Sequence, residues 1–135
     1  MSTTLNHQIS FGDCDPAGIA FYPNTFRWMD AAFHNLLRPS GGHAKICRRL
    51  HSVGLGLVDA SARFSNPMHD GDVLEIQTHV SEWSTKSMTL AYEGRVGDTI
   101  TFMGKEVRCL FVPTAQGIAA GDLTELRKIL ETRNE

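Results

Sequence analysis

The stretch PNTFRWMDAAFHNLL, residues 23–37, decides the fold. Its first residue, Pro23, suits the first position of an α-helix, because the missing backbone N–H is not needed there. Apolar side chains then recur at the spacing of one helix face: Phe26, Met29, Phe33 and Leu36. The turn-forming residues RPSGG at 38–42 end the run. The sequence therefore predicts a helix from Pro23 to Leu37, about 22 Å long.

The second half of the chain alternates apolar and polar residues, which is typical of strands with one face in water. In the first of these predicted strands, Leu74, Ile76, Thr78 and Val80 lie on one face and alternate with polar residues. In the second, Met88, Leu90 and Tyr92 do the same. Ile100–Val112 is predicted as another strand with one wet face. Val107, Cys109 and Phe111 lie on one side of this strand, and Glu106 and Arg108 lie on the other.

Shorter patterns fill in the rest of the chain. Thr4–Phe11 is compatible with a first strand, Ala44–Val53 with a short helix, and Leu57–Phe64 with a strand. The segment DLTELRKIL opens with Asp122 as a helix N-cap and Glu125 three residues later, so a capping box begins a final helix.

This order, one long helix followed by long strands joined by tight turns, is typical of an α+β fold with an antiparallel sheet. A strand of about ten residues spans roughly 33 Å, which is long enough to wrap the helix of residues 23–37. We therefore expect one domain, residues 1–135, in which the sheet curls around that helix.

Composition excludes several classes of protein. The 13 Lys and Arg residues against 15 Asp and Glu give a net charge of −2, and the basic residues are scattered, so no nucleic-acid partner is expected. No apolar run approaches the roughly 18 residues of a membrane span, and the first ten residues lack the pattern of a signal peptide. Cys14, Cys47 and Cys109 are odd in number and widely spaced, so we expect free thiols and a cytoplasmic protein.

The common catalytic motifs are absent from the sequence. It contains no Gly-x-Ser-x-Gly elbow, no Walker-type phosphate loop, no dinucleotide fingerprint and no His-Glu-x-x-His. Cys47 and His51 stand one helical turn apart, but two ligands are too few for a zinc site, so we interpret them as a buried thiol beside a surface imidazole. No metal or redox cofactor is expected.

The stretch FGDCDPAGIAFYP, residues 11–23, places a carboxylate just before a helix N-terminus. Backbone N–H groups there lack internal partners and carry partial positive charge, so the N–H of Tyr22 can bind a developing oxyanion. Asp15 can then act on a carbonyl held at that point, as nucleophile or as general base for water. Such a sparse site suits a good leaving group, and a thiolate, with a parent pKa of about 8.5, fits thioesters better than esters or amides.

Three carboxylates, Asp13, Asp15 and Asp30, also have a structural interpretation. An aspartate ahead of Pro-Ala-Gly can close a turn or favour the helix end, and this reading is stronger for Asp13 than for Asp15. Asp30 lies on an otherwise apolar helix flank. There it is either exposed to solvent at the edge of the buried face or in contact with a polar ligand group.

At these residues the sequence resembles the 4-hydroxybenzoyl-CoA thioesterase family of the hotdog-fold superfamily, in the branch with an aspartate catalyst. The match is close over FGDCDPAGIAFYPNTFRWMD, residues 11–30, and weaker in NPMHDGDVLEI and SEWSTKS. The resemblance implies that Asp15 is the catalytic carboxylate and that the Tyr22 N–H polarises the thioester carbonyl. It also implies that Asp30 accepts the hydroxyl of an aromatic acyl group.

Two departures from the family pattern bear on the substrate. Where the family has two arginines and a lysine that hold the nucleotide of coenzyme A, this chain has Ser84, Thr85 and Lys86, so these three are the expected substrate contacts. Thr25 replaces an aromatic residue of the family's helix segment and reshapes the acyl pocket. The resemblance also implies dimers that join sheet edges, paired into a homotetramer, with active sites at subunit boundaries.

The residues of the loop favour a thioester substrate, and the resemblance implies an acyl-CoA thioesterase that hydrolyses an aromatic acyl-CoA such as 4-hydroxybenzoyl-CoA. Two alternatives stay open. One is a thioesterase for short- or medium-chain aliphatic acyl groups, and the other is a hotdog protein that binds acyl-CoA without turnover.

Overall fold

The computed structural model describes residues 2–132 and contains one curved sheet and three α-helices within that range. The strands are β1 (Ser2–Gln8), β2 (Gly54–Phe64), β3 (Val73–Trp83), β4 (Met88–Val96), β5 (Thr99–Thr114) and β6 (Gly117–Ala120). The helices are α1 (Pro23–Leu37), α2 (His43–Arg49) and α3 (Thr124–Thr132), with 3-10 turns η1 (Phe11–Asp13) and η2 (Arg38–Ser40).

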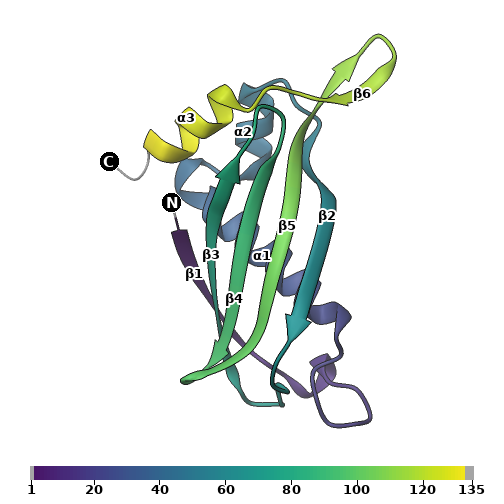
Figure 1. Cartoon of the computed structure of the whole chain (residues 1–135), viewed down its shortest axis with the longest axis vertical. Helices are drawn as coiled ribbons and strands as arrows, with labels where there is room; N and C mark the ends of the chain where they lie inside the picture. The colour runs from purple at the N-terminus through teal and green to yellow at the C-terminus, as the bar shows by residue number, and fades with distance from the viewer. Residues whose placement is uncertain (1, 133–135) are drawn as a thin grey trace.

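The sheet is antiparallel and curls around α1, as Figure 1 shows. Its strand order is β1-β3-β4-β5-β2, and β6 pairs with the end of β5. This leaves β1 and β2 at the two edges of the main sheet. The loop between β1 and α1 lies at one end of the sheet, whereas α2 and α3 lie at the other end. The expected α+β fold with a sheet wrapped around a long central helix is confirmed.

The apolar face of α1 packs into the hollow of the sheet. Met29, Ala32 and Phe33 are fully buried there. Gly104 of β5 lies beneath Met29, where an added Cβ would stand 2.8 Å from the methionine sulfur. The missing side chain therefore lets the helix approach the sheet closely.

The helix predicted from Pro23 to Leu37 begins and ends at those residues. The predicted first strand is partly wrong, because β1 ends at Gln8 and residues 11–13 form the turn η1 instead. That turn is fixed by the Asp13 side chain, which accepts a hydrogen bond from the Ser10 N–H at 2.9 Å.

The predicted short helix is also too long at its end. Helix α2 stops at Arg49, because the chain turns at His51, which has a positive φ of 55°, and β2 already begins at Gly54. Strand β5 runs on to Thr114 and folds back as β6, a hairpin that the sequence analysis missed. In Figure 1 this hairpin projects beyond the rest of the sheet.

The capping box predicted for the last helix is half present. Asp122 accepts a hydrogen bond from the Thr124 N–H at 2.7 Å, but Glu125 pairs with Lys128 at 3.3 Å instead of returning to the cap. Hydrogen bonding to Thr124 holds the pKa of Asp122 below its usual value. Within residues 2–132, no helix is both long and apolar enough to cross a membrane.

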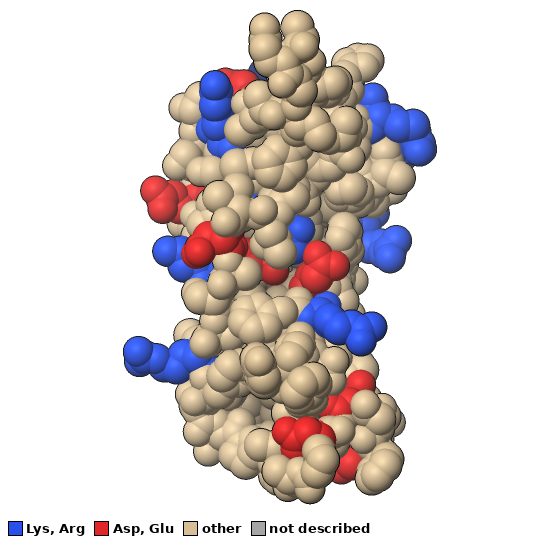
Figure 2. Space-filling view, turned by 90° about the vertical axis from the view of Figure 1, so that its right-hand side faces the viewer, with Lys and Arg blue, Asp and Glu red and all other residues tan. Residues whose placement is uncertain are grey.

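The edge formed by β2 exposes a series of apolar side chains. Leu57, Val58 and Phe64 are each about half exposed, at 48%, 60% and 47%. Figure 2 views the molecule from this side, where positive and negative residues are interspersed among wide uncharged areas. An exposed apolar edge strand of this kind is a surface suited to pairing with another chain.

Candidate active site

The loop between β1 and α1 gives its two aspartates different tasks. Asp13 is tied into the structure, because its carboxylate contacts His7 Nε2 at 3.1 Å and accepts the Ser10 N–H at 2.9 Å. Its backbone carbonyl accepts the Phe21 N–H at 2.8 Å. The hydrogen bond from Ser10 lowers the pKa of Asp13, although partial burial opposes the shift. Asp13 therefore holds the loop in shape.

Asp15 closes the tight turn of Pro16, Ala17 and Gly18. Its Oδ1 accepts the Ala17 N–H at 2.9 Å, and its carbonyl accepts the Gly18 N–H at 2.9 Å. Gly18 has a φ of 81°, which favours glycine at that point. The second carboxylate oxygen, Oδ2, accepts no hydrogen bond from the part of the chain that the structure describes. The turn thus orients Asp15 and leaves one oxygen available to a substrate or a water.

Tyr22 stands at the start of α1 with its backbone N–H unused. Pro23 has no N–H, and the next two amides donate to Phe21 O at 3.0 Å and to Tyr22 O at 3.1 Å. Within residues 2–132 the Tyr22 N–H donates to no other group. Because the partial positive charge of the helix lies at this end, the free N–H is suited to bind a carbonyl oxygen.

A cavity of about 300 Å³ opens beside this helix start. Its lining is mostly apolar and comes from the helix start and from the end of β2 with the loop that follows: Ile19, Ala20, Tyr22, Thr25, Phe64, Ser65, Asn66, Pro67 and Met68. Thr25 is fully buried, and its hydroxyl has no hydrogen-bond partner among the described residues. The cavity is therefore lined by Tyr22 and Thr25 but not by Asp30.

Asp30 lies on the flank of α1 that faces β2 and β5. Its Oδ1 accepts a hydrogen bond from Arg108 Nη2 at 2.8 Å, and the side chain is 49% exposed. Asp30 follows Tyr22 by eight residues, which is about 12 Å along the helix. A single chain therefore does not bring Asp30 to the cavity beside Tyr22.

The partners of Asp30 correct the expectation for β5. Glu106 and Arg108 were placed on a strand with one face in water, yet they are 1% and 2% exposed. They lie on the face of β5 toward α1. Their burial there is tolerated because they neutralise one another, with Arg108 Nε donating to Glu106 Oε1 at 3.0 Å. Alternation alone cannot detect such a pair. The only signal in the sequence is that Glu106 and Arg108 lie two residues apart on one strand face.

Ser84, Thr85 and Lys86 lie in the turn between β3 and β4, far from the loop that carries Asp15. The eleven residues of β3 separate the two regions by roughly 33 Å. Ser84 and Thr85, with Trp83 and residues of α3, line a second cavity of about 550 Å³. Lys86 lies close enough to Asp122 to lower the pKa of that carboxyl, as a smaller influence than Thr124. The structure does not join these three residues to Asp15 and Tyr22 within one chain.

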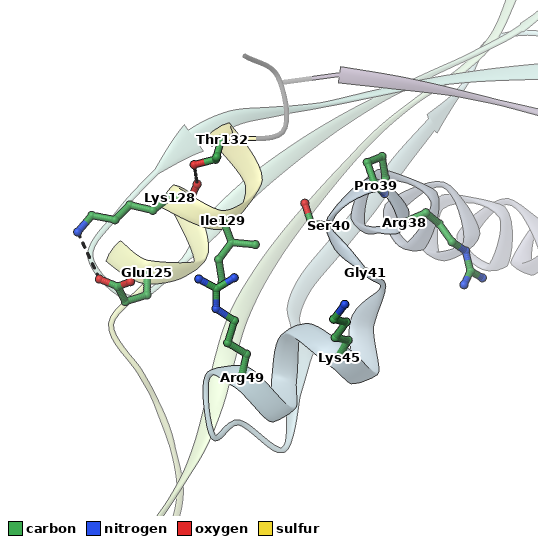
Figure 3. A pocket seen from close by; sticks show the side chains of 10 residues that line it. All are labelled: Arg38, Pro39, Ser40, Gly41, Lys45, Arg49, Glu125, Lys128, Ile129 and Thr132. Carbon is green, nitrogen blue, oxygen red and sulfur yellow. Dashed lines mark hydrogen bonds and ion pairs between the residues drawn. The ribbon is translucent and has the colours of Figure 1, made fainter.

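A third cavity, of about 480 Å³, lies between η2, α2 and α3. Figure 3 shows its basic side chains, Arg38, Lys45, Arg49 and Lys128. Lys128 reaches away from the others to pair with Glu125 at 3.3 Å, and Arg38 points outward from α1. This cavity adjoins the C-terminal end of α1, opposite to Tyr22, and includes none of the predicted site residues.

Metal ligands do not gather in the described part of the chain, where no three His, Cys, Asp or Glu side chains are placed to hold an ion. Cys47 is 5% exposed, and its Sγ lies 3.6 Å from Nε2 of His43 rather than beside His51. Burial raises the pKa of the Cys47 thiol. All three cysteines are free.

Two known proteins with similar sequences are named as enzymes that hydrolyse coenzyme A thioesters. The 4-hydroxybenzoyl-CoA thioesterase of Pseudomonas sp. (strain CBS-3) is 40% identical over 90 residues, 64% of this chain. The aligned region spans 62% of that enzyme, which is less than two thirds of its length. A 1,4-dihydroxy-2-naphthoyl-CoA hydrolase of Nostoc punctiforme (strain ATCC 29133 / PCC 73102) is 29% identical over 100 residues, 74% of this chain and 68% of that enzyme.

Solved structures extend the likeness to nearly the whole chain. The structure of 4-hydroxybenzoyl-CoA thioesterase from the same Pseudomonas strain has a TM-score of 0.84 at 30% identity, covering 96% of this chain and 98% of that one. A dynemicin thioesterase has a TM-score of 0.85 at 15% identity over 98% and 97% of the two chains, which shows the shared fold alone. The profile of the Thioesterase-like superfamily matches residues 9–120. With the hotdog architecture and the family resemblance both confirmed, the chain belongs to the Thioesterase-like superfamily.

Proposed function

We propose that this protein is an acyl-CoA thioesterase that hydrolyses an aromatic acyl-CoA, such as 4-hydroxybenzoyl-CoA, to the free acid and coenzyme A. One observation carries the proposal: the unpaired backbone N–H of Tyr22, a residue that stands at the start of α1, lines an apolar cavity and follows the loop of Asp15. The similar enzymes, named for 4-hydroxybenzoyl-CoA and 1,4-dihydroxy-2-naphthoyl-CoA, both act on aromatic thioesters that carry hydroxyl groups.

The reaction begins when the thioester carbonyl oxygen accepts the Tyr22 N–H. Charge that develops on this oxygen is stabilised by the helix N-terminus. Asp15 then acts through its free oxygen in one of two ways. As a nucleophile it forms a mixed anhydride with the acyl group and expels the coenzyme A thiolate, and water later hydrolyses the anhydride. As a general base it takes a proton from a water that attacks the carbonyl directly.

The assembly completes the site. Arg108 donates both to Asp30 and to the Leu55 carbonyl, so Asp30 lies beside the beginning of β2, whereas Tyr22 shares its cavity with Phe64 at the end of β2. Antiparallel pairing of two β2 edges sets the Phe64 end of one copy beside the Leu55 end of its partner. The cavity of one copy thereby meets Asp30 of the partner subunit, and two such dimers form the homotetramer.

Ser84, Thr85 and Lys86 act in this assembly as contacts for the nucleotide of coenzyme A. Because roughly 33 Å separates them from the Asp15 loop of their own chain, they serve an active site on another copy. Lys86 supplies the cation for a phosphate group, and the two hydroxyl side chains supply hydrogen bonds. A cytoplasmic location belongs to the same proposal, since free cysteines suit a reducing compartment.

A short- or medium-chain aliphatic acyl group is the second candidate substrate. It is favoured by the apolar lining of the cavity and by Thr25, which is smaller than the aromatic residue that the family carries there. A binding protein without turnover is the least favoured, because binding alone requires neither a free carboxylate oxygen at Asp15 nor a free N–H at Tyr22.

The test is release of free thiol from 4-hydroxybenzoyl-, benzoyl-, phenylacetyl- and hexanoyl-CoA by the wild type and by Asp15→Asn. We expect release from 4-hydroxybenzoyl-CoA, and a loss of at least about 100-fold in kcat in the variant, because the nucleophile or base is gone. Asp98→Asn, on the exposed turn between β4 and β5, is the matched control and should retain full activity.

Other outcomes redirect the proposal. A preference for hexanoyl-CoA keeps the chemistry and transfers the assignment to aliphatic substrates. No release from any of the four, with coenzyme A thioesters still bound, rejects the enzyme. Oxygen-18 from solvent that appears first in Asp15 during a single turnover separates the anhydride route from direct attack by water.

A further inference from the structure

Four side chains form a continuous polar chain between the sheet and α1. The Tyr92 hydroxyl donates to Glu106 Oε1, and Arg108 Nε donates to the same oxygen at 3.0 Å. The remaining guanidinium nitrogens donate to the Leu55 carbonyl at 3.2 Å and to Asp30 Oδ1 at 2.8 Å. Tyr92, Glu106 and Arg108 are almost fully buried, and only Asp30 reaches the surface.

This chain holds Arg108 in one orientation. Its three nitrogens each have an acceptor, and its guanidinium lies over the Phe33 ring at 4.0 Å from the ring centre. Burial alone would lower the pKa of Arg108, but the hydrogen bonds and charges of Glu106, Asp30 and Tyr92 together outweigh it, so the pKa is raised. A buried guanidinium with an acceptor on each of its three nitrogens has a fixed orientation and can orient a neighbouring carboxylate.

The consequence for Asp30 is that its two oxygens differ. Oδ1 is held by Arg108, and His34 Nε2 lies 3.6 Å from the same oxygen. Oδ2 accepts no hydrogen bond from residues 2–132, and half of the side chain is exposed. A carboxylate in this state presents one free acceptor oxygen. It suits a hydroxyl donor on the acyl group, whereas an anionic substituent would meet a second negative charge.

We infer that Arg108, fixed by Glu106 and Tyr92, is the positioning residue that sets the free oxygen of Asp30 and thereby makes the enzyme select acyl groups that carry a hydroxyl. This inference rests on the proposed thioesterase function. Arg108 does not touch the thioester, so its effect is on the choice between substrates that differ only in that hydroxyl.

The test compares kcat/KM for 4-hydroxybenzoyl-CoA and benzoyl-CoA in the wild type, Arg108→Lys and the control Arg95→Lys. Lysine keeps the positive charge beside Glu106 but lacks the planar fork that bonds Glu106, Leu55 and Asp30 together. We expect the preference for the hydroxylated substrate to fall by about tenfold or more, as for the loss of one charged hydrogen bond. Benzoyl-CoA should keep its rate within about twofold, since it makes no hydrogen bond to Asp30.

A second variant covers the case in which Arg108→Lys does not fold. Glu106→Gln combined with Arg108→Met removes both buried charges together, so neither is left unpaired, and it should show the same loss of preference. Arg95 pairs with Glu93 at 2.8 Å elsewhere on the sheet, and Arg95→Lys should leave the preference unchanged.

The outcomes are distinguishable. An unchanged preference in both Arg108 variants, or an equal loss on the two substrates, overturns the positioning role and leaves the proposed thioesterase standing. If the wild type releases no thiol from either substrate, the proposed function fails and this inference fails with it.

Discussion

At the scale of single residues, neighbouring carboxylates of the same type have been given separate roles by their hydrogen bonds. Asp13 and Asp15 stand two positions apart, and the sequence alone could assign either of them to a turn. In the structure Asp13 accepts from Ser10 and contacts His7, whereas Asp15 uses only one oxygen in its turn. The distinction depends on where β1 ends and brings His7 near the loop, which no local pattern reveals.

Asp13 should therefore affect stability in a pH-dependent way. Its folded pKa lies below the ordinary value of 3.8, so its contribution is complete above that value and is lost as the pH falls through the lowered pKa. We expect Asp13→Asn to destabilise the protein by about 1 kcal/mol at about pH 6 and by less at about pH 3. Urea unfolding at both pH values measures this, and an equal difference at the two values would contradict it.

At the scale of elements, the helix and the buried faces of β3 and β4 were predictable, whereas the inward face of β5 was not. Pro23 and the RPSGG turn are local signals, and they set both ends of α1. The inward face of β5 depends instead on two contacts. Glu106 pairs with Arg108 on the same strand, and Arg108 pairs with Asp30, which is 78 residues away in the chain. A pairing between distant segments leaves no periodic trace, so alternation gave the wrong environment for these two charges.

Strand β4 offers a test of how tightly the sheet packs. Gly94 is paired with Phe102 of β5, and the Phe102 ring occupies the space that a Cβ at Gly94 would need. Because Phe102 is fully buried and has no free space to move into, we expect Gly94→Ala to lower the free energy of unfolding by about 1–3 kcal/mol. Gly12→Ala, where an added Cβ meets nothing within 4 Å, is the control for denaturant unfolding. A loss no larger than that of Gly12→Ala would refute the overlap.

At the scale of the whole molecule, one chain holds the parts of the predicted site in separate places. Asp15 and Tyr22 lie at one end of α1, Asp30 lies about 12 Å along it, and Lys86 lies beyond the far end of β3. The resemblance supplied these residues as a set. Their separation follows only from the fold. Under the proposed function it would make the arrangement of copies a condition for activity, and the exposed apolar edge of β2 is a surface on which copies could pair.

Mixed assemblies test this condition. If each site takes Asp15 from one copy and Asp30 from its partner, a pair formed by Asp15→Asn and Asp30→Ala chains contains one intact site. Each variant alone should hydrolyse 4-hydroxybenzoyl-CoA poorly, whereas chains unfolded together and refolded should recover about one quarter of wild-type activity, the value for random pairing in two-fold dimers. Asp15→Asn mixed with the double variant Asp15→Asn/Asp30→Ala is the control and should recover none. Recovery equal to the mean of the separate variants would place both carboxylates in one chain, and a monomer mass that is independent of concentration would rule out the shared site altogether.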